Sequence, residues 1–350
     1  MFATFTPEMK LNSRYLCAAR VLALAMSVVC LLSVSGLIVA AQETSTLLML
    51  RPKLKDRNAD KIDTVKPGVD SSIIAPVVQS DVSEIKIGGK PATITAWTPL
   101  LNGPTKLQLV VLFDSQLRIG INRQFDEIKN LFNSLPPNVE IAVGFLLQGK
   151  AVIKQPFTAD RTVAGNALHL PTILEALNPK NDNGDPYNCL HDLAVHWPDP
   201  DPKKVRAVLV FPGGHGNHYA SQGSGFEQTN HEVDSVSYDL IRAGIAPFSI
   251  DYVPPEIPIG SPGSVSGGIS DQLSKMTNGE AISYYGVRGA TSTSVDPLLY
   301  RFYSILYSEA VVTVTAKGSG LQRLDIKSSN DAIKVVGPDQ VMIGNELPAK

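Results

Sequence analysis

Cysteine is scarce in this sequence: Cys17, Cys30 and Cys189 are the three cysteines among 350 residues. Cys17 and Cys30 lie in the N-terminal segment, so cleavage of that segment would leave Cys189 alone and exclude an intrachain disulfide. The fold is then expected to depend on its hydrophobic core and its hydrogen bonds. A lone cysteine is more often a small buried hydrophobic residue than a catalytic thiol, so we assign Cys189 to the core.

A strong charge of either sign is also missing. The formal net charge is -2, and 18% of the residues are charged while 43% are hydrophobic. A chain without a basic field does not attract phosphate backbones, so nucleic acid is not expected as a partner. The composition is that of a globular protein that can bury a full core.

Long apolar runs are absent except near the N-terminus. Val21 to Ala40 form an almost unbroken apolar run that ends in small residues up to Ala41 and follows three basic residues (Lys10, Arg14, Arg20). This pattern is typical of a secretory signal peptide, so residues 1–41 are predicted to direct export to the periplasm, the cell envelope or the medium. The run is also about long enough to span a bilayer, so an uncleaved signal anchor is the alternative, and the protein would then contact the membrane only there.

The remainder of the chain divides into segments of different pattern. Residues 42–80 are polar and are predicted to be a flexible linker, and residues 81–104 are predicted to form a β-hairpin that turns at Gly88-Gly89. From 105 to 307, apolar strands such as LQLVVLF alternate with helical segments, and residues 308–350 are mostly strand. Strands without polar alternation are typical of a sheet buried on both faces. The sequence therefore predicts a doubly wound, mostly parallel α/β sheet with a small β appendage from the N- and C-terminal flanks.

Ligands of such sheets bind in the crevice outside the carboxyl ends of the strands. The residues that follow three of the predicted strands can be identified: Asp114-Ser115-Gln116, Pro212-Gly213-Gly214-His215-Gly216, and Asp251-Tyr252. These loops are the candidate binding site. The alternative is that they are plain connections in which glycine allows the chain to turn.

The order of these elements resembles a known family. LVVLFDS, a helix, NVEIAVGF, an edge strand, the helix CLHDLAVHW, AVLVFPGG and DLIRAGIAPFSIDY follow one another as in a von Willebrand factor type A domain, and the resemblance extends over residues 80–343. The most similar members are the exported VWFA-related proteins of acidobacteria. The resemblance implies a vWA-like α/β domain that binds a protein or a surface polymer at its crevice loops. In that family a divalent metal is held by Asp-x-Ser-x-Ser, by a Thr from a second loop and by an Asp from a third.

This sequence departs from that metal motif. It keeps Asp114 and Ser115, but Gln116 and Arg118 stand at the two Ser positions, Asn188 at the Thr position, and Gly213 at the second Asp position. A hard cation needs several oxygen ligands, and one carboxylate with a guanidinium nearby makes a poor site. The adhesion site is therefore predicted to be degenerate, with no metal and no other cofactor, and to bind its partner directly.

Two enzyme-like features were weighed against this interpretation. His215, His218 and His231 lie in one glycine-rich stretch and could chelate a transition metal, although loop histidines without a metal are commoner. The Gly213-Gly214-His215-Gly216 segment is similar to an esterase oxyanion loop, but the sequence has no Gly-x-Ser-x-Gly pentapeptide for the nucleophile. We therefore predict an exported, non-catalytic interaction module. A secreted hydrolase that uses the Gly-Gly-His-Gly loop and a structural envelope component are the alternatives.

Overall fold

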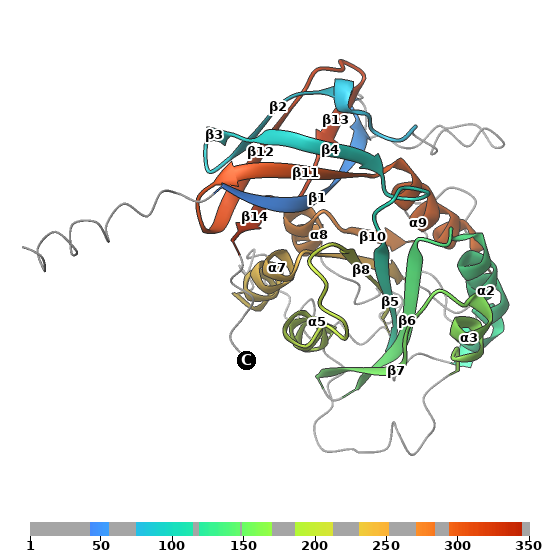
Figure 1. Cartoon of the computed structure of the whole chain (residues 1–350). Helices are drawn as coiled ribbons and strands as arrows, with labels where there is room; N and C mark the ends of the chain where they lie inside the picture. Colours follow the sequence, from blue (N-terminus) through green and yellow to red (C-terminus); the bar gives the residue numbers. More distant parts are fainter. Residues whose placement is uncertain are drawn as a thin grey trace, which may run out of the picture. The chain divides into compact units, whose positions relative to one another are not determined.

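We describe the protein from a computed structural model (Figure 1). The structure describes residues 43–55, 75–114, 119–147, 149–169, 186–212, 231–251, 271–283 and 294–344, all within the unit Glu43–Lys350. Within these ranges, no helix combines the length and the apolar character that a membrane span requires. Residues 1–41 lie outside the described ranges, so signal peptide or signal anchor stays a prediction.

A six-stranded sheet forms the centre of the α/β part. Its strands lie in the order β10 (Glu280–Ser283), β9 (Ile245–Asp251), β8 (Val205–Phe211), β5 (Leu107–Asp114), β6 (Val139–Leu147) and β7 (Lys150–Thr158). Neighbouring strands pair in parallel except β7, which is antiparallel to β6. The expected turn into β7 is confirmed, because Gly149 has a φ of 70°, which glycine adopts without strain.

Helices cover both faces of this sheet, because its central strands point apolar side chains in both directions. Leu109, Val111 and Phe113 of β5 share a core with α2 (Phe125–Ser134), α3 (Arg161–Asn166) and α9 (Asp296–Ser308). The residue that α3 contributes to this core is Ala164. Val110 and Leu112 point the other way, toward α5 (Pro186–Val195), α7 (His231–Ala243) and α8 (Asp271–Thr277). Cys189 of α5 is buried in this second core, as predicted. A 3-10 helix, η2 (Ile119–Gln124), leads into α2.

The other strands form two four-stranded sheets. One has the order β13 (Ile333–Val336), β1 (Glu43–Leu54), β11 (Ala310–Lys317) and β4 (Thr93–Pro99), and the other has the order β14 (Gln340–Ile343), β12 (Gly320–Ser328), β2 (Val82–Ile87) and β3 (Lys90–Pro91). A short 3-10 helix, η1 (Gln79–Asp81), precedes β2. Every pairing in both sheets is antiparallel. Leu50 and Val312 of the first sheet and Ile85 and Ile343 of the second belong to one core, so the two sheets pack together (Figure 1).

The predicted fold class is therefore wrong for this chain. We expected one doubly wound, mostly parallel vWA-like sheet with a small β appendage, but two of the three sheets are antiparallel throughout and have a core of their own. The error arose mainly in residues 42–80, which we expected to be an irregular linker. Their first part is the twelve-residue strand β1, which lies between β11 and β13 and so builds the sheet from both flanks.

One face of the β1–β11 pair joins the antiparallel part to the α/β part. Met49 of β1 and Val311 of β11 lie in the same core as Phe302 of α9 and Phe248 of β9. On the other face, Leu48 and Val312 belong to the core between the two antiparallel sheets. Both faces of β1 and β11 are thus buried over part of their length. We call the contact of β1 and β11 with α9 and the edge strand β10 the junction.

Candidate functional site

The carboxyl end of the six-stranded sheet is where the sequence placed the binding site, and Asp114 lies there as expected. It is the last residue of β5, its Cα is paired in register with that of Leu146, and it is 2% exposed. Beneath it, the ring of Phe113 stacks on Phe211 at a centroid distance of 4.9 Å and meets Phe125 edge-on at 5.7 Å. Asp114 is engaged in an interaction within the chain. Asp114 is therefore a buried residue that already interacts with another part of the chain.

Asn188 lies at the same end of the sheet. It is an exposed residue of α5, and a Cβ built on Gly149 would be 3.5 Å from the Cβ of Asn188. Gly149 turns the chain just after β6, whose residue Leu146 is the register partner of Asp114. Asn188 therefore lies beside the turn after β6, at the end of the sheet where Asp114 ends β5.

The other predicted site residues lie outside the described ranges. These are Ser115, Gln116, Arg118, Gly213, Gly214 and His215, together with His218 and the side chain of His231. Their place in a site stays a prediction, as does a transition-metal site in the histidine-rich stretch. Among the residues that the structure describes, no group of three or more His, Cys, Asp or Glu side chains could hold a metal ion.

A carboxylate that the sequence analysis missed fixes the helices at this end. Glu127, in the first turn of α2, accepts hydrogen bonds from the backbone N–H groups of Val295 (2.8 Å) and Asp296 (3.0 Å) and from the Ser294 hydroxyl (3.2 Å). Gln124, which is 5% exposed, accepts a second bond from the Val295 N–H at 3.2 Å. A carboxylate at a helix N-terminus satisfies free N–H groups and favours the helix dipole. Glu127 therefore ties the start of α9 to α2.

The outer face of α9 presents tyrosines to solvent. Tyr300 is 41% exposed and Tyr307 is 36% exposed, and the half-buried Tyr303 stacks on Tyr307 at a centroid distance of 6.4 Å. Their spacing of three and four residues places them on one side of the helix, while Phe302 and Ile305 face the core. We call these three residues the tyrosine ridge. The sequence showed this helix to be rich in Leu and Tyr, but gave no reason to separate the exposed tyrosines from core ones.

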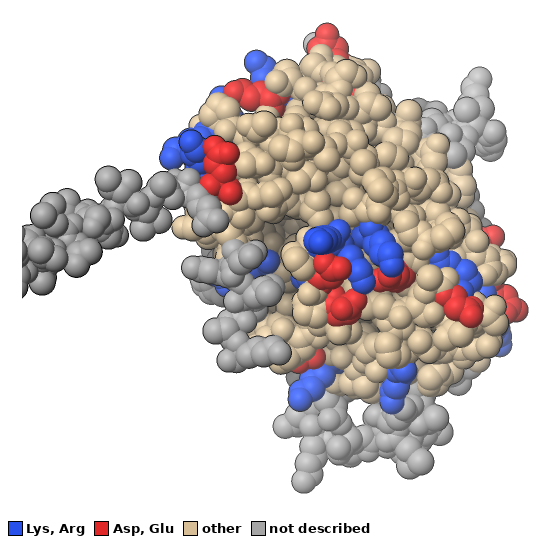
Figure 2. Space-filling view, in the orientation of Figure 1, with Lys and Arg blue, Asp and Glu red and all other residues tan. Residues whose placement is uncertain are grey.

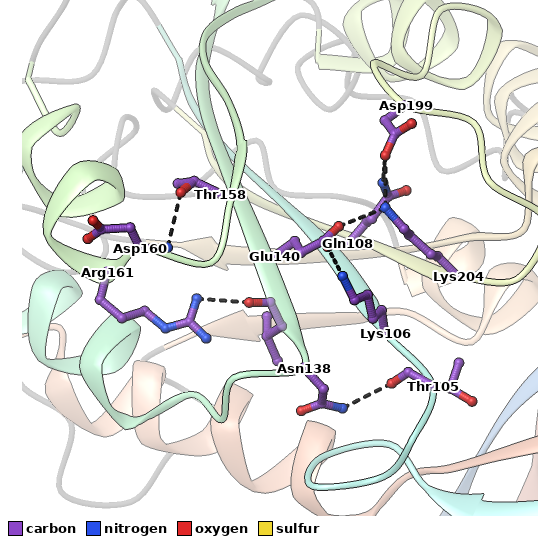
Figure 3. Close-up of polar contacts among 11 residues, drawn as sticks. Thr105, Lys106, Gln108, Asn138, Glu140, Thr158, Asp160, Arg161, Asp199 and Lys204 are labelled. Atoms are coloured by element: carbon purple, nitrogen blue, oxygen red, sulfur yellow. Dashed lines mark hydrogen bonds and ion pairs between the residues drawn. The ribbon is translucent and has the colours of Figure 1, made fainter.

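A network of charged side chains lies at the opposite, amino end of the strands (Figure 3). Lys204 donates to Glu140 and to Asp199 at 2.9 Å each, Lys106 donates to Glu140 at 2.7 Å, and Gln108 donates to Asp199 at 2.9 Å. Hydrogen bonds to Asp199 and Glu140 raise the pKa of Lys204. Desolvation opposes the ionisation of Glu140, yet the bonds from the two lysines hold its pKa below the ordinary value. Hydrogen bonds from Lys204 and Gln108 likewise lower the pKa of Asp199, so Lys204, Glu140 and Asp199 are stabilised in their ionised forms.

This network joins separate elements of the same chain. Lys106 and Lys204 immediately precede β5 and β8, Glu140 belongs to β6, and Asp199 lies in the WPDPDP segment after α5. On the face shown in Figure 2, basic and acidic side chains lie beside one another and large areas carry no charge. The amino end therefore joins three strands and a connecting segment through paired charges, and we assign it a structural role.

His191 of α5 and His196, the residue directly after α5, each contact a carboxylate. His191 Nδ1 lies 2.7 Å from Asp239 Oδ2 of α7, and His196 Nδ1 lies 3.1 Å from Asp192 Oδ1 of α5. Arg242 also contacts Asp239, at 3.3 Å. The first pair joins α5 to α7 on the outside of the second core.

Comparisons with known proteins do not assign this chain to a family. No protein-family model matches the sequence, and no curated protein matches it. Among solved structures, the PilB minor pilin from Streptococcus sanguinis is 12% identical over 59% of this chain and 61% of the pilin, with a TM-score of 0.34. A mutant of the same pilin gives a TM-score of 0.35 at 12% identity, over 59% of this chain and 62% of the pilin. The chain covers less than two thirds of the pilin's length, and a likeness at this TM-score carries no argument.

Proposed function

We propose that this chain is an exported interaction module that binds a protein or a surface polymer without catalysing a reaction. Export rests on the sequence of residues 1–41, where basic residues, an apolar run and small residues follow one another. The binding surface is the carboxyl end of the parallel strands together with the tyrosine ridge. The ridge begins about one helical turn from the end of α9 that Glu127 holds.

The observation that carries this proposal is the tyrosine ridge. Tyr300 and Tyr307 expose large rings on a helix whose other side is packed into the core. Tyrosine offers a large contact area and a polar hydroxyl at a small cost in side-chain entropy, and it is enriched where proteins bind partners. Because the tyrosine ridge lies on a helix that is already formed, binding a partner would cost little conformational entropy.

The burial of Asp114 supports the proposal that the partner binds without a divalent metal. A cation held between protein and partner needs carboxylate oxygens that reach the surface. Asp114 is 2% exposed and already has an interaction within the chain. Ser115 keeps the family's residue, whereas Gln116, Arg118, Asn188 and Gly213 do not. Arg118 would bring a permanent positive charge to such a site.

Affinity capture from a cell-envelope extract tests the proposal. The mature chain, immobilised on beads, is expected to retain a partner in the presence of chelator, and the double variant Tyr300→Ala/Tyr307→Ala is expected to lose it. Val163→Ala on α3 is the matched control, because Val163 is also a surface hydrophobic residue, 40% exposed. Retention by the double variant, or loss on adding chelator, would contradict the proposal. Failure to retain any partner would favour a structural envelope component, and turnover in a screen of ester and peptide substrates would favour the hydrolase.

N-terminal sequencing tests export separately. A mature protein that begins at Gln42 is expected. A membrane-bound protein that begins at Met1 would establish the signal anchor instead.

A further inference from the structure

Glu309 is a buried carboxyl group that nothing in the proposed function uses. It lies between the end of α9 and the start of β11, and it is fully buried. Its backbone is satisfied, since its N–H donates to the Leu306 carbonyl and its carbonyl accepts from the Leu100 N–H. Neither oxygen of its side chain has a hydrogen-bond partner among the residues that the structure describes. A carboxyl group in such a place needs a reason, because its desolvation costs free energy that no bond returns.

The residue across from Glu309 is an arginine. Leu50 of β1 pairs with Ala310 of β11, so one further step of the same antiparallel register sets Arg51 opposite Glu309. Side chains alternate along strands, which puts Arg51 on the same face as Met49 and Glu309 on the same face as Val311, toward the core of the α/β part. Arg51 is 5% exposed, and its Nε also lacks a partner among the described residues. A cation and an acid group without a mutual bond thus face each other in the junction.

Arg51 is at present bound to the edge of the six-stranded sheet. Its guanidinium donates to Glu280 at 3.0 Å and to the Gly279 carbonyl at 2.8 Å. Arg301 of α9 holds the other oxygen of Glu280 through two bonds of 3.2 and 2.9 Å. The Arg51–Glu280 pair therefore fastens β1 to β10, and it is the ion pair by which the antiparallel part holds the α/β part at this point.

Burial, more than the charges around it, decides the protonation state of Glu309. Arg51 of β1 attracts an ionised Glu309, and Glu280 of β10 repels it. Arg301 of α9 is committed to Glu280, and β4, which leads to Leu100, carries no charged residue. Lys53 of β1 adds positive charge nearby, with Lys275 of α8 and Lys334 of β13 in its surroundings. Burial outweighs the attraction of Arg51 and raises the pKa of Glu309 to about 8, so the group is neutral at neutral pH.

We propose that Glu309 is a buried proton-binding site that sets the strength of the junction. While the O–H bond of Glu309 is intact, the neutral acid does not compete for Arg51, which stays on Glu280 and the Gly279 carbonyl. When the proton leaves to solvent, a carboxylate stands in a medium of low dielectric constant, across the strand register from Arg51, whose Nε has no hydrogen-bond partner among the described residues. It draws the guanidinium away from Glu280 and loosens the attachment of β10 and of the turn before it.

Hydrogen exchange of the intact chain tests this proposal. Amide protection in residues 279–282, corrected for the intrinsic rate, is expected to fall roughly thirtyfold between pH 6.5 and 9, because one released proton linked to opening lowers protection about tenfold per pH unit up to the folded pKa of about 8, while protection in α2 stays constant. Glu309→Gln keeps the shape of the neutral acid and is expected to remove this fall. Glu43→Gln is the control, because Glu43 is an exposed glutamate of the same sheet.

Two outcomes would overturn the proposal. One is equal loss of protection in wild type and Glu309→Gln, and the other is constant protection in the wild type over this pH range. If Glu309→Gln does not fold, infrared spectra of the wild type give an independent measurement. A protonated-carboxyl band that is present at pH 6.5 and lost by pH 9 is expected, and its absence at pH 6.5 would show that Glu309 is already ionised.

Discussion

Trp197 donates its indole N–H to the side-chain oxygen of Gln108 at 2.8 Å, in the buried centre of the sheet's amino end. Gln108 is fully buried within β5 and uses its amide nitrogen to bind Asp199 at 2.9 Å. One glutamine in the central strand thus holds both the ring that follows α5 and the acidic segment after it. Gln108 therefore joins the central strand to Trp197 and Asp199, beside the buried Arg206 of β8, whose guanidinium lies 5.7 Å from the centre of the Trp197 ring.

Replacing Gln108 with Leu is therefore expected to destabilise the protein by about 1–3 kcal/mol, because the Trp197 N–H would be left buried without an acceptor. The free energy of unfolding from urea titration measures the effect. Gln79→Leu is the control, since Gln79 is exposed in η1 and should change stability by less than about 0.5 kcal/mol. Equal stability of the two variants would show that Trp197 finds another acceptor.

Arg161 is expected to be a second polar residue on which stability depends. Its guanidinium donates to the carbonyls of Val139 (2.8 Å), Leu135 (3.3 Å) and Pro136, which close the end of α2 and lead into β6. Figure 3 shows one of these bonds. Arg161→Met keeps much of the side-chain volume but removes every donor, so a loss of about 1–3 kcal/mol is expected. Arg323→Met is the matched control, because Arg323 is an exposed arginine whose guanidinium pairs with Asp325 of its own strand. A loss of similar size in the control would show that arginine removal acts through net charge and not through these carbonyls.

The free energy of unfolding is expected to depend on pH through Glu309. The pKa of Glu309 is about 8 in the folded protein, against 4.5 for an ordinary glutamate. Between these values the folded state binds one more proton than the unfolded state, so stability decreases as pH rises, by at most about 1.4 kcal/mol per pH unit, and levels off above the folded value. Below the ordinary value both states are protonated and the effect vanishes.

Glu309→Gln should remove this contribution. The variant is expected to gain stability over the wild type as pH rises from 5 to 8, as measured by urea titration at each pH, while Glu43→Gln keeps the wild-type slope. A difference between Glu309→Gln and wild type that does not change with pH would mean that Glu309 titrates near its ordinary pKa.

The elements with strong local signals could be predicted. The apolar run Leu107–Asp114 is buried at every position, because a strand between two others with helices on both faces meets no solvent. Gly149 and Gly244 mark a turn and a helix end with φ values of 70° and 65°, which are strained for other residues. At these positions the residue type by itself indicates the local structure.

The fold class was not predictable in the same way. β1 begins with the polar residues ETST and contains Pro52, so it resembles a linker when taken alone. It becomes a strand because β11 and β13, far along the chain, supply its partners, as in the pair of Leu50 with Ala310. Pairing over such separations leaves no local pattern. Counting alternating strands and helices therefore overestimated the parallel sheet and missed the two antiparallel ones.

In the candidate site, too, some residues could be predicted from the sequence and others could not. The strand-end rule placed Asp114 at the carboxyl end of the sheet, and the structure has it there, whereas Asn188 was chosen through the family resemblance and lies beside Gly149. Glu127 and Glu309 gave no signal, because the role of the first depends on Val295 and that of the second on Arg51. Each is one acidic residue among many until the chain brings its partner beside it.

Divalent metal ions are expected not to bind at Asp114. The carboxylate is 2% exposed and has an interaction within the chain, so a cation would have to displace that partner and enter a buried position. Gln116 and Asn188 could each offer one neutral oxygen, whereas Gly213 offers no side chain. Hard cations bind weakly to such a set, because they require several oxygens, of which some are anionic.

Titration calorimetry with magnesium, calcium and manganese measures this directly. No saturable heat is expected, and no thermal shift beyond that of a monovalent salt of equal ionic strength, because screening alone would act on the exposed ion pairs. Asp114→Asn should lower stability, since it weakens a buried polar interaction, but it should leave the metal titrations unchanged. A stoichiometric metal that is lost in Asp114→Asn and kept in Asp325→Asn, a change on the exposed side of β12, would restore a metal-dependent adhesion mechanism.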